Sequence, residues 1–150
     1  MYTIGQEIAD FTLENHLGEP VRLSQFRGKK VLIWFYPKAS TPGCTAEGCS
    51  LRDHFAEFTE KNTQILGISM DPVKKQNSFV EKQQFPYPLL SDPERVVITA
   101  FGAWGSKKFM GKTFDGILRS SFLIDEEGKL QKEYREVKTK SHGGDVLADL

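Results

Sequence analysis

The sequence predicts a layered α/β fold, because strand-like and helix-like segments alternate along it. Residues 31–36 form a continuous apolar run, typical of a strand buried on both faces. Thr41 and Pro42 follow with the side chains that a helix prefers at its N-cap and first position. A second strand pattern at residues 64–70 precedes another helix start, at Asp71 and Pro72. Successive strand–helix pairs of this kind predict a central sheet covered by helices.

The remaining elements follow in order. Strands at residues 11–13 and 21–23, joined by turn-like residues 15–20, predict an N-terminal hairpin. The helix that starts at Thr41 is expected to continue to about residue 61 and the next one to about residue 84. A short strand at 87–90, a helix at 92–101 and a hairpin of residues 120–125 and 130–135 complete the list. Gly143 and Gly144 are poor helix formers, which leaves the start of a last helix open.

Length and composition set limits on the whole molecule. The 150 residues contain no repeat or linker, so we expect a single domain over residues 1–150. Equal numbers of basic and acidic residues, 20 each, indicate no nucleic-acid partner. No apolar stretch approaches the roughly 20 residues of a membrane span and no leader pattern is visible, which predicts a cytoplasmic protein without a membrane partner. Three lysines, Lys107, Lys108 and Lys112, are expected in a solvated loop.

Cys44 lies in the first turn of the helix that begins after Thr41. The positive end of the helix dipole and unpaired backbone N–H groups favour a thiolate at this position. The sequence therefore proposes an activated sulfur nucleophile. An alternative is that Cys44 fills the core, because Cys44, Gly48, Leu51, Phe55 and Phe58 follow at the spacing of one buried helix face.

Cys49 is the second of the two cysteines in the chain. Five residues along a straight helix separate two Cα atoms by about 8 to 9 Å. A disulfide requires about 7 Å or less, so a bond between these cysteines would need the helix start to unwind. Gly48 would ease that unwinding by about 1 kcal/mol relative to alanine. The alternative is a half-buried thiol that does not react.

A metal site is not expected from these residues. His16, His54 and His142 do not combine with the cysteines at the spacing of zinc ligands. Cys44, Cys49 and His54 follow at five-residue steps, which rotate around a helix instead of converging.

The chain resembles the peroxiredoxins of the bacterioferritin comigratory protein, or peroxiredoxin Q, group. Pro37, Thr41 and Cys44 match the family pattern Pro-x-x-x-Thr-x-x-Cys, and Cys49 matches the resolving cysteine found in many members. Residues 90–93, 101–105, 116–125 and 142–150 resemble further group segments in the expected order. The resemblance covers essentially the whole chain and implies a thioredoxin-like fold with the N-terminal hairpin and insertions of peroxiredoxins.

The resemblance also implies an activity and a role for each matched residue. The Cys44 thiolate would attack the O–O bond of a peroxide and become a sulfenic acid, which Cys49 would convert to a disulfide. Thr41 would supply a hydroxyl, Pro37 would shape the pocket and Arg119 would stabilise charge. Thioredoxin or a similar dithiol protein would reduce the disulfide, with no cofactor, and the group favours a monomer.

Each of these roles has a simpler alternative. Thr41 suits a plain N-cap, Pro37 a strand end and Arg119 an exposed position at the start of a strand. Arg52 is a second, weaker candidate for the cation, and it would otherwise pair with Asp53 or Glu57 on a solvated helix face.

Two other functions remain open from the sequence. A thioredoxin-like disulfide oxidoreductase would use the same dithiol, although such enzymes typically carry Cys-x-x-Cys. A redox-sensing binding protein would instead expose apolar residues of the unwound helix to a partner.

Overall fold

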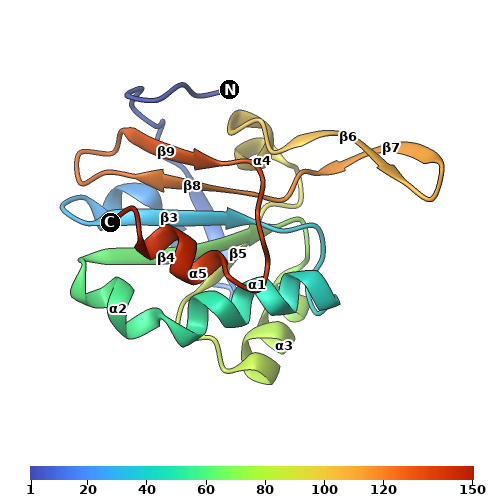
Figure 1. Cartoon of the computed structure of the whole chain (residues 1–150), viewed down its shortest axis with the longest axis horizontal. Helices are drawn as coiled ribbons and strands as arrows, with labels where there is room; N and C mark the ends of the chain where they lie inside the picture. The colour runs from blue at the N-terminus through green and yellow to red at the C-terminus, as the bar shows by residue number, and fades with distance from the viewer.

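The computed structural model describes residues 1–150 and has a seven-stranded sheet with the order β2-β1-β5-β4-β3-β8-β9 (Figure 1). The strands are β1 (Thr12–Asn15), β2 (Pro20–Arg22), β3 (Lys30–Phe35), β4 (Thr63–Ser69), β5 (Leu89–Ser91), β6 (Trp104–Phe109), β7 (Lys112–Ile117), β8 (Ser120–Ile124) and β9 (Leu130–Tyr134). The helices are η1 (Leu23–Phe26), α1 (Pro42–Asp53), α2 (Phe55–Glu60), α3 (Val73–Gln83), α4 (Val96–Ala100) and α5 (His142–Leu147). The predicted α/β class with a central mixed sheet agrees with this arrangement.

β3 is a central strand, as its apolar sequence predicts. It pairs in parallel with β4 and antiparallel with β8, so both of its edges are hydrogen-bonded inside the sheet. Successive side chains point to opposite faces of a strand. Val31, Ile33 and Phe35 accordingly join one buried cluster. Leu32 and Trp34 join the cluster on the other face.

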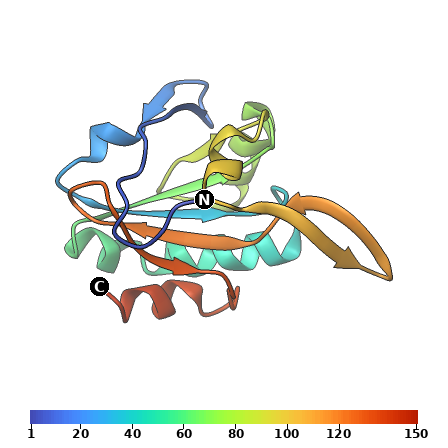
Figure 2. The same ribbon diagram turned by 90° about the horizontal axis from the view of Figure 1, so that it is seen from above.

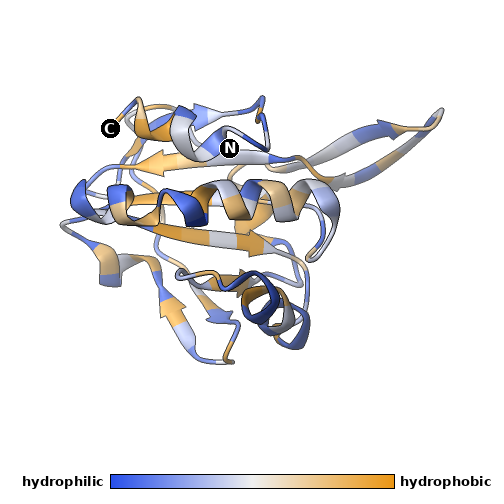
Figure 3. Ribbon diagram, turned by 60° about the horizontal axis from the view of Figure 1, so that its bottom comes forward, coloured by the Kyte–Doolittle hydropathy of each residue, from blue (hydrophilic) through white to orange (hydrophobic).

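Two layers of elements cover the two faces of the sheet. The cluster that contains Trp34 also takes in side chains from α1, α2, α3 and α5, namely Cys44, Leu51, Phe58, Phe79 and Val146. The other cluster is covered by η1 and α4. Figure 2 shows α1 and α5 on one side of the central strands and η1 and α4 on the other. Hydrophobic residues colour much of the central strands in Figure 3, whereas the helices also carry hydrophilic ones. α1 therefore belongs to one layer only.

The helix expected from Thr41 to about residue 61 is two helices. α1 ends at Asp53, and His54 has φ −106° and ψ 10° before α2 begins at Phe55. The His54 N–H bonds to Leu51 at 3.3 Å, a tighter turn than an α-helix has. The apolar spacing continues across this break, which is why the sequence pattern did not reveal it.

The helix expected at residues 92–101 is shorter than predicted. Asp92 does not begin the helix; its carboxylate accepts the N–H groups of Val96 at 3.1 Å and Ile98 at 2.8 Å. Arg95 has a left-handed backbone with φ 60°, so the regular helix α4 starts only at Val96. The Asp92 side chain bonds to the first turn of α4 from four residues before Val96, which explains why the helix starts later than predicted.

Residues 104–117 form an antiparallel hairpin, β6 and β7, where a solvated loop was expected around the lysines. It pairs with no other strand and projects from the same end of the molecule as the start of α1 (Figure 1). Phe109, Met110 and Phe114 are exposed on it. A ribbon with solvent on both faces carries no strict alternation of apolar residues, so its strands were not recognised.

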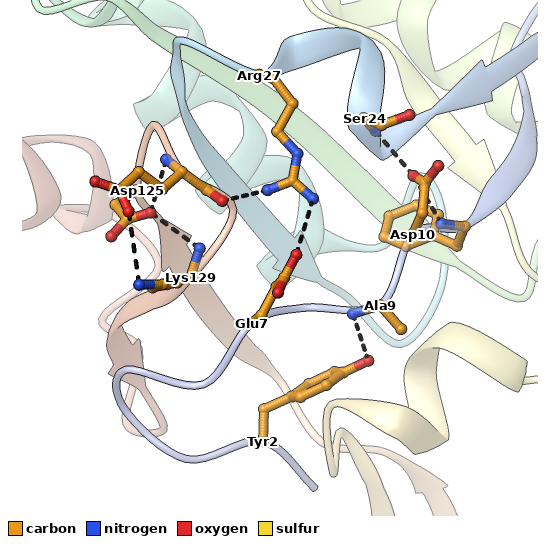
Figure 4. A network of polar contacts seen from close by, with 10 residues as sticks. Tyr2, Glu7, Ala9, Asp10, Ser24, Arg27, Asp125 and Lys129 are labelled. Atoms are coloured by element: carbon orange, nitrogen blue, oxygen red, sulfur yellow. Dashed lines mark hydrogen bonds and ion pairs between the residues drawn. The ribbon is translucent and has the colours of Figure 1, made fainter.

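Polar contacts fix the N-terminal segment against the turn between β8 and β9 (Figure 4). The guanidinium of Arg27 lies 3.7 Å from a carboxylate oxygen of Glu7 and donates to the carbonyl of Glu127. Gly128 has φ +85°, and a Cβ atom there would overlap the guanidinium of Arg27. Ile8, between these contacts, is 1% exposed. The first residues of the chain are thus part of the folded structure.

Candidate active site

Cys44 is completely buried in the first turn of α1, where the loop after β3 turns back over the sheet. Thr41 has an extended backbone with φ −86° and ψ 155°, and Pro42 occupies the first helical turn. These are the positions that the sequence predicts for both residues. The Cys44 side chain also belongs to the apolar cluster below α1, so the core position and the helix-start position coexist.

Arg119 brings a cation to this thiol from the connection between β7 and β8. Its Nη2 atom lies 3.5 Å from the Sγ atom of Cys44. A Cβ atom at Gly43 would lie 3.0 Å from the same nitrogen, so glycine leaves room for the guanidinium beside the helix start. Because Cys44 and Glu47 both favour its charged form, the pKa of Arg119 is raised despite its partial burial. Arg119 is therefore not the plain surface residue of the alternative interpretation.

Glu47 holds the other side of the same guanidinium. It lies three residues after Cys44 on α1, is 0% exposed, and accepts a hydrogen bond from Arg119 Nη1 at 2.8 Å. Burial raises the pKa of Glu47 to about 7, although the hydrogen bond and charge of Arg119 oppose that shift. Cys44, Arg119 and Glu47 thus form a continuous chain of contacts at the start of α1.

Thr41 and Pro37 lie in the loop that leads to Cys44. The Thr41 hydroxyl donates to the carbonyl of Lys38 at 2.7 Å and makes no capping bond to the helix, although Thr41 occupies the predicted N-cap position. Pro37 is half-buried directly after the end of β3.

Cys49 lies further along α1 and is half-buried, and both cysteines carry free thiols. Its Sγ atom donates to Gln83 Oε1 of α3 at 3.5 Å. Between the cysteines, a Cβ atom at Gly48 would lie 2.5 Å from the ring of Phe85. Gly48 therefore serves close packing as well as helix flexibility.

Arg52 is not part of the Cys44 site. Its Nε atom pairs with Asp53 at 3.0 Å, and its Nη1 atom donates to the carbonyl of Gln83 at 2.7 Å. This pairing is the alternative that the sequence allowed, in which Arg52 bonds to a neighbouring carboxylate on α1.

Lys107, by contrast, reaches toward the site from β6. Burial and the nearby charge of Arg119 lower the pKa of Lys107, and the negative form of Cys44 opposes this shift.

Sequence reasoning missed two residues next to the site. Glu47 is a charged residue on the buried face of α1, and that position was the available signal. His142 was considered only as a metal ligand and as part of the matching segment 142–150, yet it is buried on α5 with Nε2 3.7 Å from Glu47 Oε2. No group of three or more His, Cys, Asp or Glu side chains is arranged to hold a metal ion.

A thioredoxin-like sheet with a buried thiol at a helix start beside arginine is characteristic of peroxiredoxins, which are thiol-dependent peroxidases. The chain belongs to the AhpC/TSA family, whose pattern matches residues 4–133. It is 50% identical to the putative peroxiredoxin bcp of Haemophilus influenzae over 93% of this chain and 90% of that protein. It is 47% identical to peroxiredoxin Bcp of Escherichia coli K12, over 91% and 88% of the two chains.

Solved structures confirm the predicted fold and group. The bacterioferritin comigratory protein of Xanthomonas campestris, studied for alkyl peroxide reduction, superposes with a TM-score of 0.87 at 38% identity over 93% of this chain and 88% of that chain. A variant of PrxQ from Xylella fastidiosa superposes with a TM-score of 0.94 at 31% identity, over 99% and 95% of the two chains. None of the helices in this chain has the length and apolar character needed to span a bilayer.

Proposed function

We propose that Cys44 is the nucleophile of a peroxidase that reduces hydrogen peroxide and organic hydroperoxides. The observation that carries this proposal is the 3.5 Å contact between Cys44 Sγ and Arg119 Nη2 at the start of α1. The thiolate attacks one peroxide oxygen, the O–O bond breaks, and the leaving oxygen takes a proton to become water or an alcohol. Cys44 is left as a sulfenic acid. The Xanthomonas campestris relative supports alkyl hydroperoxides as one substrate class.

Arg119 is suited to assist this attack. A fixed guanidinium stabilises both the thiolate and the negative charge that develops on the leaving oxygen. Thr41 is positioned three residues before the nucleophile, and its hydroxyl would exchange the Lys38 carbonyl for a peroxide oxygen. Pro37 would shape the peroxide site near the end of β3.

The proposed second step forms a disulfide between Cys44 and Cys49. The Cys49 thiolate attacks the sulfenic sulfur, a sulfur–sulfur bond forms, and hydroxide leaves as water after protonation. Since both residues lie on α1, this step requires the first turns of the helix to open. A dithiol protein such as thioredoxin then reduces the disulfide. We place this cycle in a cytoplasmic monomer, and size-exclusion chromatography with light scattering would test the monomeric state.

Single-turnover kinetics with mass spectrometry test the cycle. Reduced protein is mixed with one equivalent of hydrogen peroxide and quenched with a thiol-blocking reagent. We expect fast oxidation that ends with the loss of two hydrogen atoms and a Cys44–Cys49 link. Cys44→Ser should not consume peroxide, and Cys49→Ser should react once and stop at the sulfenic acid. An active Cys44→Ser variant would overturn the nucleophile assignment, and full recycling of Cys49→Ser would overturn the resolving role.

A further inference from the structure

Glu47 has one carboxylate oxygen that the Arg119 contact does not use. Oε1 accepts from Arg119, whereas Oε2 is buried and has no hydrogen-bond partner. A buried polar atom without a partner is rare in folded proteins and is often associated with function. The nearest ionisable side chain on that side is His142, whose Nε2 atom lies 3.7 Å from Oε2.

His142 is the first residue of α5 and is 2% exposed. Its Nε2 atom lies 2.7 Å from the Oγ atom of Ser121 on β8. The ring also packs edge-on against Tyr134 of β9, with 5.6 Å between the ring centroids. Three elements therefore fix the imidazole, and its Nε2 atom lies between Ser121 and Glu47.

Burial favours a neutral imidazole at His142. Burial lowers the pKa of His142 to about 4, with Asp145 opposing that shift and Arg119 assisting it. The contact between His142 and Glu47 is therefore not an ion pair at neutral pH. On its other side, Glu47 contacts Arg119, which also contacts Cys44 on the same helix as Glu47. The charge of Glu47 also contributes to the raised pKa of Tyr87.

We propose that His142 is a positioning residue for the reaction at Cys44: held by Ser121, it lies against the free oxygen of Glu47, and so holds the carboxylate that orients Arg119. This inference rests on the proposed role of Cys44. The arrangement links α5, near the C-terminus, to the guanidinium at the start of α1 through Glu47. Without the imidazole, Glu47 Oε2 faces apolar surroundings, which favour the neutral acid and weaken the bond to Arg119.

Two substitutions separate the polar role of His142 from its packing. His142→Leu removes the nitrogen that faces Glu47, whereas His142→Gln keeps a polar group at a similar distance from the backbone. We expect the rate constant of Cys44 oxidation at pH 7 to fall about tenfold in His142→Leu, as for other groups that orient a reacting residue. We expect His142→Gln to stay within about threefold of the unchanged protein.

The pH profile distinguishes positioning from a general loss of structure. The rate in His142→Leu should recover at alkaline pH, because Glu47 is then ionised and anchors Arg119 again. His54→Leu is a matched control, since His54 also lies against α5 but bonds to Ser50 and not to Glu47. An unchanged rate and profile in folded His142→Leu, or an equal effect of His54→Leu, would overturn the proposal.

A measurement on the unchanged protein tests the coupling without relying on activity. In protein with ¹⁵N-labelled histidine rings, the Nε2 resonance of His142 should shift with a midpoint near pH 7, the pKa of Glu47. Glu47→Gln should abolish that inflection, and His16 and His54 serve as internal references. If the His142 Nε2 resonance shows no inflection near pH 7, or if Glu47→Gln leaves that inflection unchanged, the proposal is overturned, even if His142→Leu fails to fold. This result stays meaningful if Cys44 proves not to be the nucleophile.

Discussion

Arg119 contacts both the thiol and the buried carboxylate, which gives its side chain a defined orientation. Its two terminal nitrogens are divided between Cys44 and Glu47, at 3.5 and 2.8 Å. A cation fixed in this way needs little rearrangement when charge develops on the leaving oxygen. The reactivity of Cys44 should therefore depend on this particular arginine.

We predict that Arg119→Ala lowers the rate constant of Cys44 oxidation by about 100- to 1000-fold, the usual effect of removing a group that stabilises a transition state. Stopped-flow measurement with hydrogen peroxide would test this value. Arg52→Ala is a matched control, because Arg52 lies on α1 with Cys44 but pairs with Asp53 and the carbonyl of Gln83. An equal loss in both variants would indicate a general effect of positive charge instead of the specific contact.

The buried carboxylate predicts a pH-dependent stability. Because the pKa of Glu47 is raised from 4.5 to about 7, the native state holds a proton that the unfolded chain releases. The stabilisation from that proton is present below pH 4.5 and is lost as the pH rises through about 7. Between pH 6.5 and 8, we expect the unfolding free energy to fall by about 1 kcal/mol relative to Glu47→Gln. Urea unfolding of both proteins at the two pH values measures this difference.

A second titration, that of His142, is common to both proteins. His142 has a pKa lowered to about 4, so its stabilising contribution is present above the ordinary value of 6.5 and is lost as the pH falls toward 4. At pH 6.5 about half of the unfolded chains still carry a protonated His142, but this contribution is the same in both proteins and cancels in their difference. An identical pH dependence for the two proteins would contradict the burial of an ionising Glu47.

Several residues of the site were predictable, whereas their partners were not. The helix-start pattern and the family pattern located Cys44, Thr41 and Pro37, because those signals are local in sequence. The roles of Glu47 and His142 were not identified, because their contacts are with residues about 70 to 95 positions away in the sequence. Long-range contacts of this kind leave no periodic signal in one sequence.

At the scale of elements, α5 packs closely on α1 through its first turn. The Gly143 N–H donates to Ser50 Oγ at 2.9 Å, and a Cβ atom at Gly143 would lie 2.5 Å from the Ser50 carbonyl oxygen. The next residue differs, since a Cβ atom at Gly144 would lie 3.8 Å from His54 Nε2, an ordinary contact. The two glycines that left this helix in doubt thus have different roles.

We predict opposite effects for alanine at these two positions. Gly143→Ala should lower the unfolding free energy by about 1 to 3 kcal/mol, because backbone atoms of α1 must move. Gly144→Ala should raise it by about 0.5 to 1 kcal/mol, because alanine restricts the unfolded chain and suits a helix. Urea unfolding of the reduced proteins would compare them. Equal changes of the same sign would show that α5 does not pack on α1 as described.

The order of the main strands and helices followed from the sequence, and the errors lie at element ends and at the protruding hairpin. β3 and β4 were recognised because buried strands form long apolar runs. The break at His54 was hidden because the residues on either side keep the same buried face. The β6–β7 hairpin was missed because only its base, at Trp104 and Ile117, lies against the core, whereas most of its other residues are exposed.

At the scale of the whole molecule, we propose that residues 1–150 unfold as one domain. The two apolar clusters share the central strands, and the N-terminal segment is anchored through Arg27, Glu7 and Gly128. Calorimetry of the reduced protein should show one transition, with equal calorimetric and van't Hoff enthalpies. Two transitions would separate a subdomain and contradict this proposal.

The position of α1 in a single layer has a consequence for the oxidised protein. Opening the first turns of α1 exposes one face of the sheet locally, but the cluster under η1 and α4 remains covered on the other face. Backbone amides of α1 should then exchange rapidly with deuterated water after oxidation, whereas those of β3 and β4 remain protected. The first turns of α1 can thus unfold and refold in every catalytic cycle while the rest of the chain stays folded.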